Sequence, residues 1–106
     1  MLFVGGLKAA EDIRIFKIID RGMQSFYMEL LIESPTKEKL EKQIESLLKK
    51  YVGRKSVQID IFDNLEALQR RADEKYPTRL INKYWLVSIT DKGVYRFYLK
   101  ERPDIK

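Results

Sequence analysis

The stretch that decides the fold is residues 34–53, SPTKEKLEKQIESLLKKYVG. Ser34 and Pro35 are typical of a helix start, with serine as the N-cap and proline at the first helical position, and Gly53 suits a C-cap. One stripe of apolar side chains recurs at helical period among mostly Lys, Glu, Gln and Ser, and it consists of Leu40, Ile44, Leu47, Leu48 and Tyr51. The stretch therefore predicts an amphipathic helix over residues 35–52 that packs on a sheet.

A β-hairpin is predicted on the N-terminal side of this helix. Residues 13–19 and 23–33 are rich in apolar and β-branched side chains, and residues 20–22, Asp-Arg-Gly, suit a turn closed by a left-handed glycine. Pairing Ile19 with Met23 fixes the register. One face of the hairpin is then strongly apolar, with Phe16, Ile18, Phe26, Met28, Leu30 and Ile32, and the other is mixed, with Ile13, Ile15, Lys17, Ser25, Tyr27, Glu29 and Leu31.

A strand and a second helix are predicted after residue 53. Residues 57–62 alternate between apolar and polar side chains, as a strand does. Asp63 and Glu66 resemble a capping box, so a helix is expected over residues 65–76, ended by Pro77.

The C-terminal part predicts a second hairpin around residues 91–93, Asp-Lys-Gly, with Thr90 paired to Val94. Its turn resembles that of the first hairpin, either by duplication or by convergence on the same turn chemistry, and both hairpins are expected to share a loop type. One face then carries Trp85, Val87, Ile89, Tyr95, Phe97 and Leu99, and the other Tyr84, Leu86, Ser88, Arg96, Tyr98 and Lys100.

The element order ββαβαββ predicts an α+β fold. The expected architecture is a two-layer sandwich, in which a mainly antiparallel sheet of about five strands carries both helices on one face. Residues 1–106 are too few for a second core and are expected to form a single domain. Residues 1–11 are interpreted as an extra edge strand and its lead-in, and residues 101–106 as a frayed tail.

The composition excludes several chemistries. The chain has no cysteine and no histidine, which removes disulfides, thiolate metal sites, cysteine nucleophiles and imidazole bases. The sequence also lacks a glycine-rich phosphate loop, because Gly5 and Gly6 match neither the G-x-G-x-x-G spacing nor the Walker A spacing. We therefore expect no cofactor, no metal and no enzymatic activity.

The same composition bears on location. No apolar run is long enough to span a membrane, and the first residues lack the basic region of a signal peptide. Cytoplasmic residence is the expectation. The net charge of +5 would favour an anionic partner but equally fits a well-solvated surface.

Asp60, Asp63 and Glu66 form an acidic cluster beside a predicted strand end. They could hold magnesium or act as an acid–base pair. The structural alternative has Asp63 capping the helix and Asp60 solvated on the polar side of the strand, and we prefer it because capping alone accounts for an acid there.

One open strand face suggests single-stranded nucleic acid as a partner. Tyr84 and Tyr98 would alternate there with Arg96 and Lys100, and such aromatic and cationic side chains stack on bases and contact phosphates. The simpler interpretation is an ordinary half-exposed strand. The basic run Arg70, Arg71, Lys75, Arg79 and Lys83 is interspersed with acids and is typical of a surface laced with ion pairs.

The leading hypothesis is a non-catalytic protein-interaction or assembly module. By the predicted register, Ile13, Ile15, Leu31 and Leu86 lie on the sheet face without helices. Apolar patches of this kind are seldom left exposed in monomers. Self-association or a protein partner is therefore expected to cover these four side chains.

Overall fold

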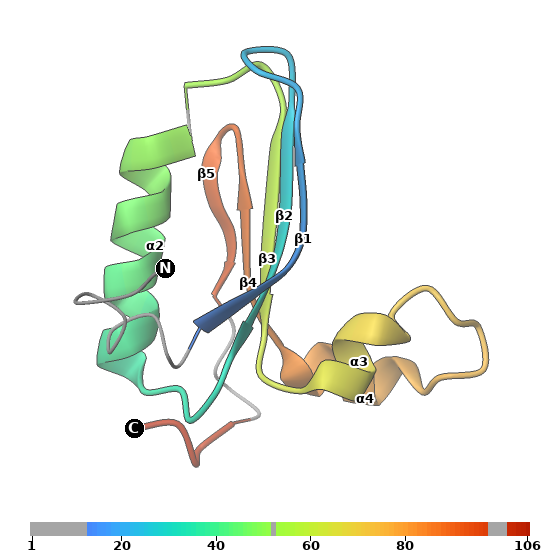
Figure 1. Ribbon diagram of the computed structural model, residues 1–106. Coiled ribbons are helices and arrows are strands. Elements are labelled where there is room, and N and C mark those ends of the chain that lie inside the picture. Colours follow the sequence, from blue (N-terminus) through green and yellow to red (C-terminus); the bar gives the residue numbers. More distant parts are fainter. Residues whose placement is uncertain (1–12, 52, 98–101) are drawn as a thin grey trace, which may run out of the picture.

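The computed structural model describes residues 13–51, 53–97 and 102–106, with the backbone alone for residues 95–97. The described residues form five strands and three helices, which confirms the α+β class (Figure 1). The extra edge strand predicted within residues 1–11 lies outside the described residues. In chain order the elements are β1 (Ile13–Asp20), β2 (Phe26–Ile32), α2 (Lys37–Tyr51), β3 (Val57–Phe62), α3 (Leu65–Gln69), α4 (Thr78–Tyr84), β4 (Trp85–Thr90) and β5 (Gly93–Phe97).

The five strands form one sheet in the order β1-β2-β3-β4-β5. The pairs β1–β2, β3–β4 and β4–β5 are antiparallel, and β2–β3 is parallel. The parallel pair follows from the chain path, since α2 carries the chain from the end of β2 back to the start of β3. The prediction of a mainly antiparallel sheet of about five strands is confirmed.

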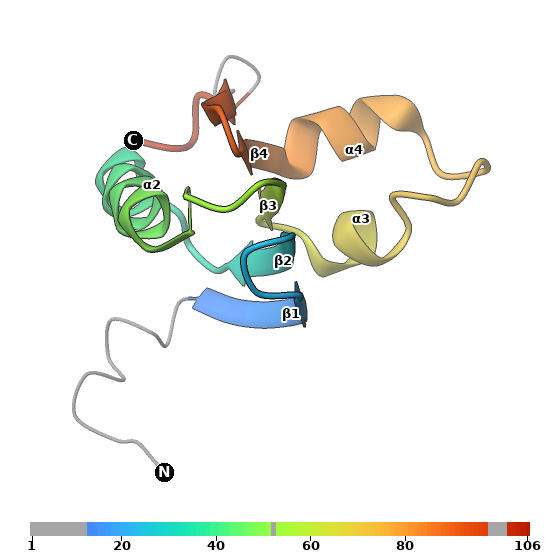
Figure 2. The same ribbon diagram turned by 90° about the horizontal axis from the view of Figure 1, so that it is seen from above.

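Helix α2 packs on one face of this sheet (Figure 2). In its predicted apolar stripe Leu40, Ile44 and Leu47 are buried, and Leu48 and Tyr51 are half-buried against the same core. The helix begins at Lys37, because the Oγ1 atom of Thr36 accepts a hydrogen bond from the backbone N–H of Lys39 at 3.1 Å. Thr36 is therefore the N-cap, and the prediction of Ser34, which has a φ of 48°, was wrong.

Helices α3 and α4 pack on the opposite face, near one end of the sheet (Figures 1 and 2). A second core lies beneath them, in which Leu31 and Phe62 from the strands contact Leu68 and Tyr76. The prediction that both helices share one face was therefore wrong. The reason is strand alternation, which turns Leu31 and Phe62 away from the α2 side and leaves an apolar surface that needs its own cover.

The second predicted helix, over residues 65–76, is also replaced by two shorter ones. Helix α3 ends at Gln69 and is capped by Asn64, whose Oδ1 accepts from the N–H of Ala67 at 2.9 Å. Asp63, the predicted cap, is one residue too early. Helix α4 begins directly after Pro77, and it was not predicted.

The first hairpin has a longer turn than predicted. Asp20 pairs with Phe26, so that residues 21–25 form the turn, and Ile19 pairs with Tyr27 rather than Met23. The ladder is also irregular between Ile15 and Lys17, where β1 carries an extra residue. This bulge turns Ile13 and Ile15 toward the α2 side, opposite Ile32 and Leu30, whereas the regular register placed them on the other face.

A second irregularity changes the faces of β4. Val87 pairs with Ile61 and Trp85 with Phe62, so that Leu86 is the extra residue between them. Leu86 consequently lies in the α2-side core with no exposure, while Trp85 packs beneath α3 and α4. The closing hairpin pairs Thr90 with Gly93, not with Val94, so the two hairpins do not share a loop type.

Residues 102–106 are held against the sheet rather than frayed. Arg102 pairs with Asp63, its Nη2 lying 2.6 Å from Asp63 Oδ2, and its side chain is 8% exposed. Ile105 joins the α2-side core, and the N–H of Lys37 donates to the carbonyl of Lys106 at 2.9 Å. The interpretation of a frayed tail was therefore wrong for these residues, because an ion pair and a buried side chain fix them.

None of the helices in the described residues has the length and apolarity that crossing a membrane requires.

Candidate functional site

A row of polar residues crosses the middle of the sheet on the face opposite α2. The strand registers place Lys17 beside Glu29, Glu29 beside Asp60, Asp60 beside Ser88, and Ser88 beside Arg96. Because directly paired residues point to the same face, the side chains of Lys17, Glu29, Asp60 and Ser88 form one row across four strands. Helices α3 and α4 cover the neighbouring row of Leu31, Phe62 and Trp85, so the polar row lies at the margin of that second core.

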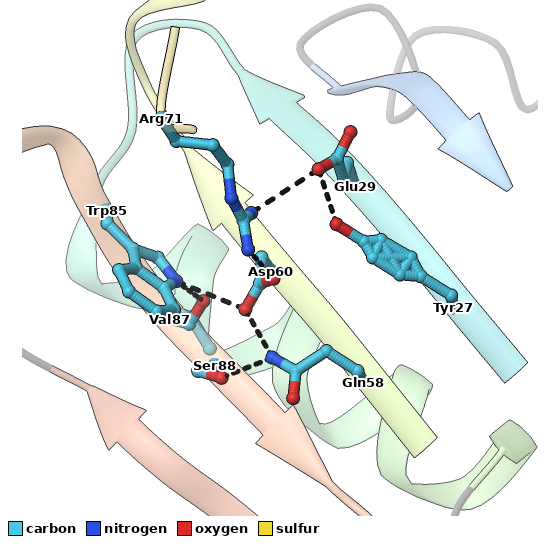
Figure 3. Close-up of polar contacts among 8 residues, drawn as sticks. All are labelled: Tyr27, Glu29, Gln58, Asp60, Arg71, Trp85, Val87 and Ser88. Carbon is cyan, nitrogen blue, oxygen red and sulfur yellow. Dashed lines mark hydrogen bonds and ion pairs between the residues drawn. The ribbon is translucent and has the colours of Figure 1, made fainter. Parts of the chain in front are cut away.

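Asp60 is the centre of this row and is fully buried. Its Oδ1 accepts hydrogen bonds from Gln58 Nε2 at 2.7 Å and from Trp85 Nε1 at 3.2 Å, and its Oδ2 accepts one from Arg71 Nη2 at 2.9 Å (Figure 3). Gln58 also donates to Ser88 Oγ at 2.8 Å. A buried carboxylate is tolerated where each oxygen has donors of this kind.

Glu29 is the second buried carboxylate of the cluster, and its residue is 7% exposed. Its Oε2 accepts a hydrogen bond from the Tyr27 hydroxyl at 2.5 Å and lies 3.4 Å from Arg71 Nη1 (Figure 3). The contact with Nη1 is an ion pair without hydrogen-bond geometry, and Nη1 is a buried polar atom with no hydrogen-bond partner. One guanidinium thus serves two carboxylates from neighbouring strands.

Arg71 also connects the cluster to the second core. Its guanidinium lies 5.4 Å from the centre of the Phe62 ring and 5.2 Å from that of Trp85. The Phe62 and Trp85 rings stack on each other with centroids 5.9 Å apart. Since Arg71 comes just after Arg70, the C-cap of α3, these contacts tie the chain between α3 and α4 to the middle of the sheet.

The geometry of this cluster favours a structural role. Both Asp60 oxygens are occupied by donors of the protein itself, and the carboxylates of Asp60 and Glu29 are neutralised in part by Arg71. Within residues 13–51, 53–97 and 102–106, no group of three acidic residues could hold a metal ion. The cluster can clamp strands and a loop, and it offers no free ligand set.

The Tyr27 hydroxyl provides a spectroscopic test of this geometry. Burial and, next to it, the hydrogen bond to Glu29 raise the pKa of Tyr27 to about 12. We expect a difference titration of tyrosinate absorbance, wild type against Tyr27→Phe, to show this group ionising well above the ordinary value near 10. Because the native pKa is raised, its contribution to stability is complete below pH ~10 and is lost as the pH rises toward about 12.

Glu29→Gln serves as the matched variant in this titration, since it removes the charge that Tyr27 donates to. The pKa of Tyr27 should then fall toward the ordinary value. Ionisation of Tyr27 near pH ~10 in the wild-type protein would contradict the contact with Glu29.

The acidic residues singled out in the sequence do not come together. Asp60 belongs to the cluster just described, Asp63 pairs with Arg102, and Glu66 lies 3.9 Å from Arg70. The expectation that Asp60 is solvated was wrong, because neighbouring strands and Arg71 enclose it. The hydrogen bonds of Arg102 with Asp104 and Asp63 raise the pKa of this guanidinium above its ordinary value.

Two residues of the basic run, Arg70 and Arg71, form ion pairs of the kind expected for it. Arg70 Nη2 lies 3.0 Å from Asp73 Oδ2, and Arg71 contacts Glu29 and Asp60. The sequence had not indicated that Arg71 would be the one residue of this run that points into the sheet. A signal for it exists only once the strand order is known, because Glu29, Asp60 and Ser88 then fall in one row.

The proposed nucleic-acid face is not assembled as predicted. Tyr84 is the last residue of α4 rather than part of β4, and its half-buried ring packs in the second core with the guanidinium of Arg102 5.4 Å from its centre. Arg96 occupies the register position opposite Ser88 in β5. Tyr98 and Lys100 lie outside the described residues. Tyr84 therefore does not alternate with Arg96 along one strand face.

The four predicted interaction residues do not share an exposed face either. Leu86 is fully buried in the α2-side core, Leu31 is 5% exposed beneath α3 and α4, and Ile13 packs at the margin of the α2-side core. Ile15 alone is exposed. The two bulges and the position of α3 and α4 account for the difference.

The exposed apolar side chains gather instead on β1 and the turn after it. They are Ile15, at 59% exposure, Phe16 at 43%, Ile18 at 49%, Ile19 at 37% and Met23 at 65%. We call these five residues the β1 patch. Among the described residues β1 pairs with β2 alone, and Figure 2 shows it as the outermost strand on that edge of the sheet. The patch therefore combines an open strand edge with apolar side chains.

Comparison of the chain with family models, with curated proteins and with solved structures found no significant match.

Proposed function

We propose that this chain is a non-catalytic protein-interaction module that binds its partner through the β1 patch. The observation that carries the proposal is the concentration of exposed apolar side chains on one edge strand. Elsewhere among the residues whose side chains the structure describes, the large exposed apolar side chains are Leu65 and Val94, which belong to separate elements. Clustered exposure of this kind marks interaction surfaces, whereas scattered apolar residues need no explanation.

The polarity of β1 supports a specific partner over open-ended aggregation. Arg14 and Lys17 are exposed within the same strand, and charged side chains on edge strands oppose indiscriminate pairing. The bulge between Ile15 and Lys17 has the same effect, because it interrupts the regular row of backbone groups. A partner must therefore match a particular pattern of apolar and cationic positions.

The polar cluster supports the non-catalytic part of the proposal. Its carboxylates are occupied by Gln58, Trp85, Arg71 and Tyr27, and a general base needs a lone pair that substrate can reach.

Site-specific photo-crosslinking tests the proposal. A photoreactive phenylalanine analogue replaces Phe16 in the chain, which is expressed in the cell that produces it. We expect a covalent adduct of discrete mass after irradiation. The matched control places the same analogue at Val94, an exposed position on β5 at the other edge of the described sheet. Absence of an adduct at Phe16, or equal adducts at both positions, would contradict the proposed interface.

A further inference from the structure

We propose that the partner of the β1 patch is a second copy of this chain, whose β1 pairs antiparallel with the first across a twofold axis. The proposal rests on the proposed function and names its partner. Two sheets would join edge to edge, and the backbone groups of each β1 that have no strand partner among the described residues would pair with those of the other copy. A shared surface patch that contacts itself is the ordinary form of a twofold dimer.

The distribution of residues along β1 favours an axis between Phe16 and Lys17. Ile15 and Ile18 both point to the α2 side, because they pair with Leu30 and Met28 on either side of the bulge. A twofold axis perpendicular to the sheet keeps each face on its own side, so residues that meet across it must share a face. An axis between Phe16 and Lys17 places Ile15 opposite Ile18 of the second copy, and the reverse.

The charges of β1 agree with the same axis. It places Lys17 opposite Phe16 of the second copy, and Arg14 opposite Ile19, so that no cation faces a cation. Shifting the axis onto Lys17 would set the two Lys17 ammonium groups against each other, which destabilises cross-strand pairs. Lys17 Nζ already lies 5.9 Å from the centre of the Tyr27 ring, so an aromatic neighbour suits this side chain.

The size of the patch is sufficient for a weak dimer. With about 200 Å² for a large apolar side chain, the exposed fractions of the strand residues Ile15, Phe16, Ile18 and Ile19 correspond to roughly 400 Å² on each copy. Two copies would then bury about 800 Å² of apolar side chain, which falls in the range of small, transient interfaces. We therefore expect a concentration-dependent dimer with a dissociation constant on the order of micromolar.

The oligomeric state provides the first test. Sedimentation equilibrium over a concentration series should show the wild-type chain passing from monomer to dimer. Ile15→Lys and Ile18→Lys should each raise the dissociation constant at least about tenfold, since each buries an ammonium group in an apolar contact. Val94→Lys makes the same change on the opposite edge and should leave the dissociation constant unchanged. Far-ultraviolet circular dichroism establishes that each variant is folded.

Disulfide trapping provides the second test, because the chain has no cysteine of its own. Ile15→Cys mixed with Ile18→Cys should form a covalent heterodimer, since the paired Cα atoms would lie within the ~4.4–6.8 Å that a disulfide spans. Ile15→Cys alone should cross-link more slowly, because its two copies would be offset along the strand by about 10 Å. The variants differ from each other only in position, so their thiols are matched.

Three results would overturn the proposal: a monomer at millimolar concentration, a dimer that Ile18→Lys does not weaken, or a mixture that cross-links no faster than Ile15→Cys alone. These results are distinguishable from failure of the proposed function. A monomeric chain whose Phe16 position still cross-links to a different protein would retain the interaction surface and exclude the second copy as its partner.

Discussion

Replacing Asp60 with alanine is expected to lower the free energy of unfolding by about 3–5 kcal/mol, because it removes one partner of a buried ion pair. Arg71 Nη2 would lose its acceptor at 2.9 Å, and Gln58 and Trp85 would each lose one of two acceptors. Denaturant unfolding monitored by circular dichroism measures the loss. The matched control is Asp91→Ala at an exposed turn position, which should change the stability by less than about 0.5 kcal/mol.

A double-mutant cycle with Arg71→Met separates the ion pair from the other contacts of Asp60. If Arg71 is the main partner, the Asp60→Ala change should cost less in the Arg71→Met background, with a coupling of about 1–3 kcal/mol. Additive effects would show that the two side chains do not interact and would contradict the cluster as described.

The second large effect is expected for Phe62→Ala, at about 3–5 kcal/mol. Phe62 is fully buried, stacks on Trp85 and packs with Ala67 and Leu68 of α3. Its removal would leave a cavity between the sheet and the α3–α4 pair, which strands and helices can fill only in part. Denaturant unfolding gives the magnitude. The matched control is Phe16→Ala at the edge of the sheet, measured at a concentration where the chain is monomeric, with an expected loss below about 1 kcal/mol.

Amide hydrogen exchange shows which part of the structure the Phe62→Ala substitution destabilises. The N–H groups of Leu68, Tyr76 and Leu80 donate to Asn64, Asp73 and Pro77 within the α3–α4 region. Their protection should fall more than that of the amides in β2 and β3, because the cavity lies on their side of the sheet. A uniform loss across both faces would indicate that the two cores do not open separately.

The sequence predicts helix α2 and its buried face well because one strong periodicity determines them. Leu40, Ile44 and Leu47 are buried as predicted. Their stripe is long enough that the buried face of the helix is predicted correctly although the N-cap is not. The second helix is different. Within the helix predicted over residues 65–76, Leu65 is 40% exposed and Ala72 is exposed, and Asp73 accepts a hydrogen bond from the N–H of Lys75 in a turn instead. A short, weak stripe is readily overruled by such local hydrogen bonds.

The sheet faces were mispredicted because bulges carry no clear sequence signal. One extra residue in β1 moves Ile13 and Ile15 to the other face, and one in β4 buries Leu86 beside Val87. Alternation assigns faces correctly only in a regular ladder.

The polar cluster escaped sequence analysis for a related reason. Glu29, Asp60 and Ser88 come from strands far apart in the chain, and each looks like an ordinary polar position on a half-exposed strand. They lie side by side because β2 pairs in parallel with β3, and the segment after α3 places Arg71 in contact with Glu29 and Asp60. Long-range registers of this kind are not encoded in local periodicity.

The agreement between strand order in the sheet and strand order in the chain bears on how the protein folds. Each strand pairs with the next one along the sequence. The two longest connections between paired strands are the one that contains α2 and the one that contains α3 and α4. Contacts close in sequence cost little chain entropy to form, and proteins rich in them cross the folding barrier quickly. Assembly can therefore proceed by addition of neighbouring hairpins to the β2–α2–β3 unit. Among the described strands, β1 and β5 lie at the two ends of that order, and each is held by a single neighbour.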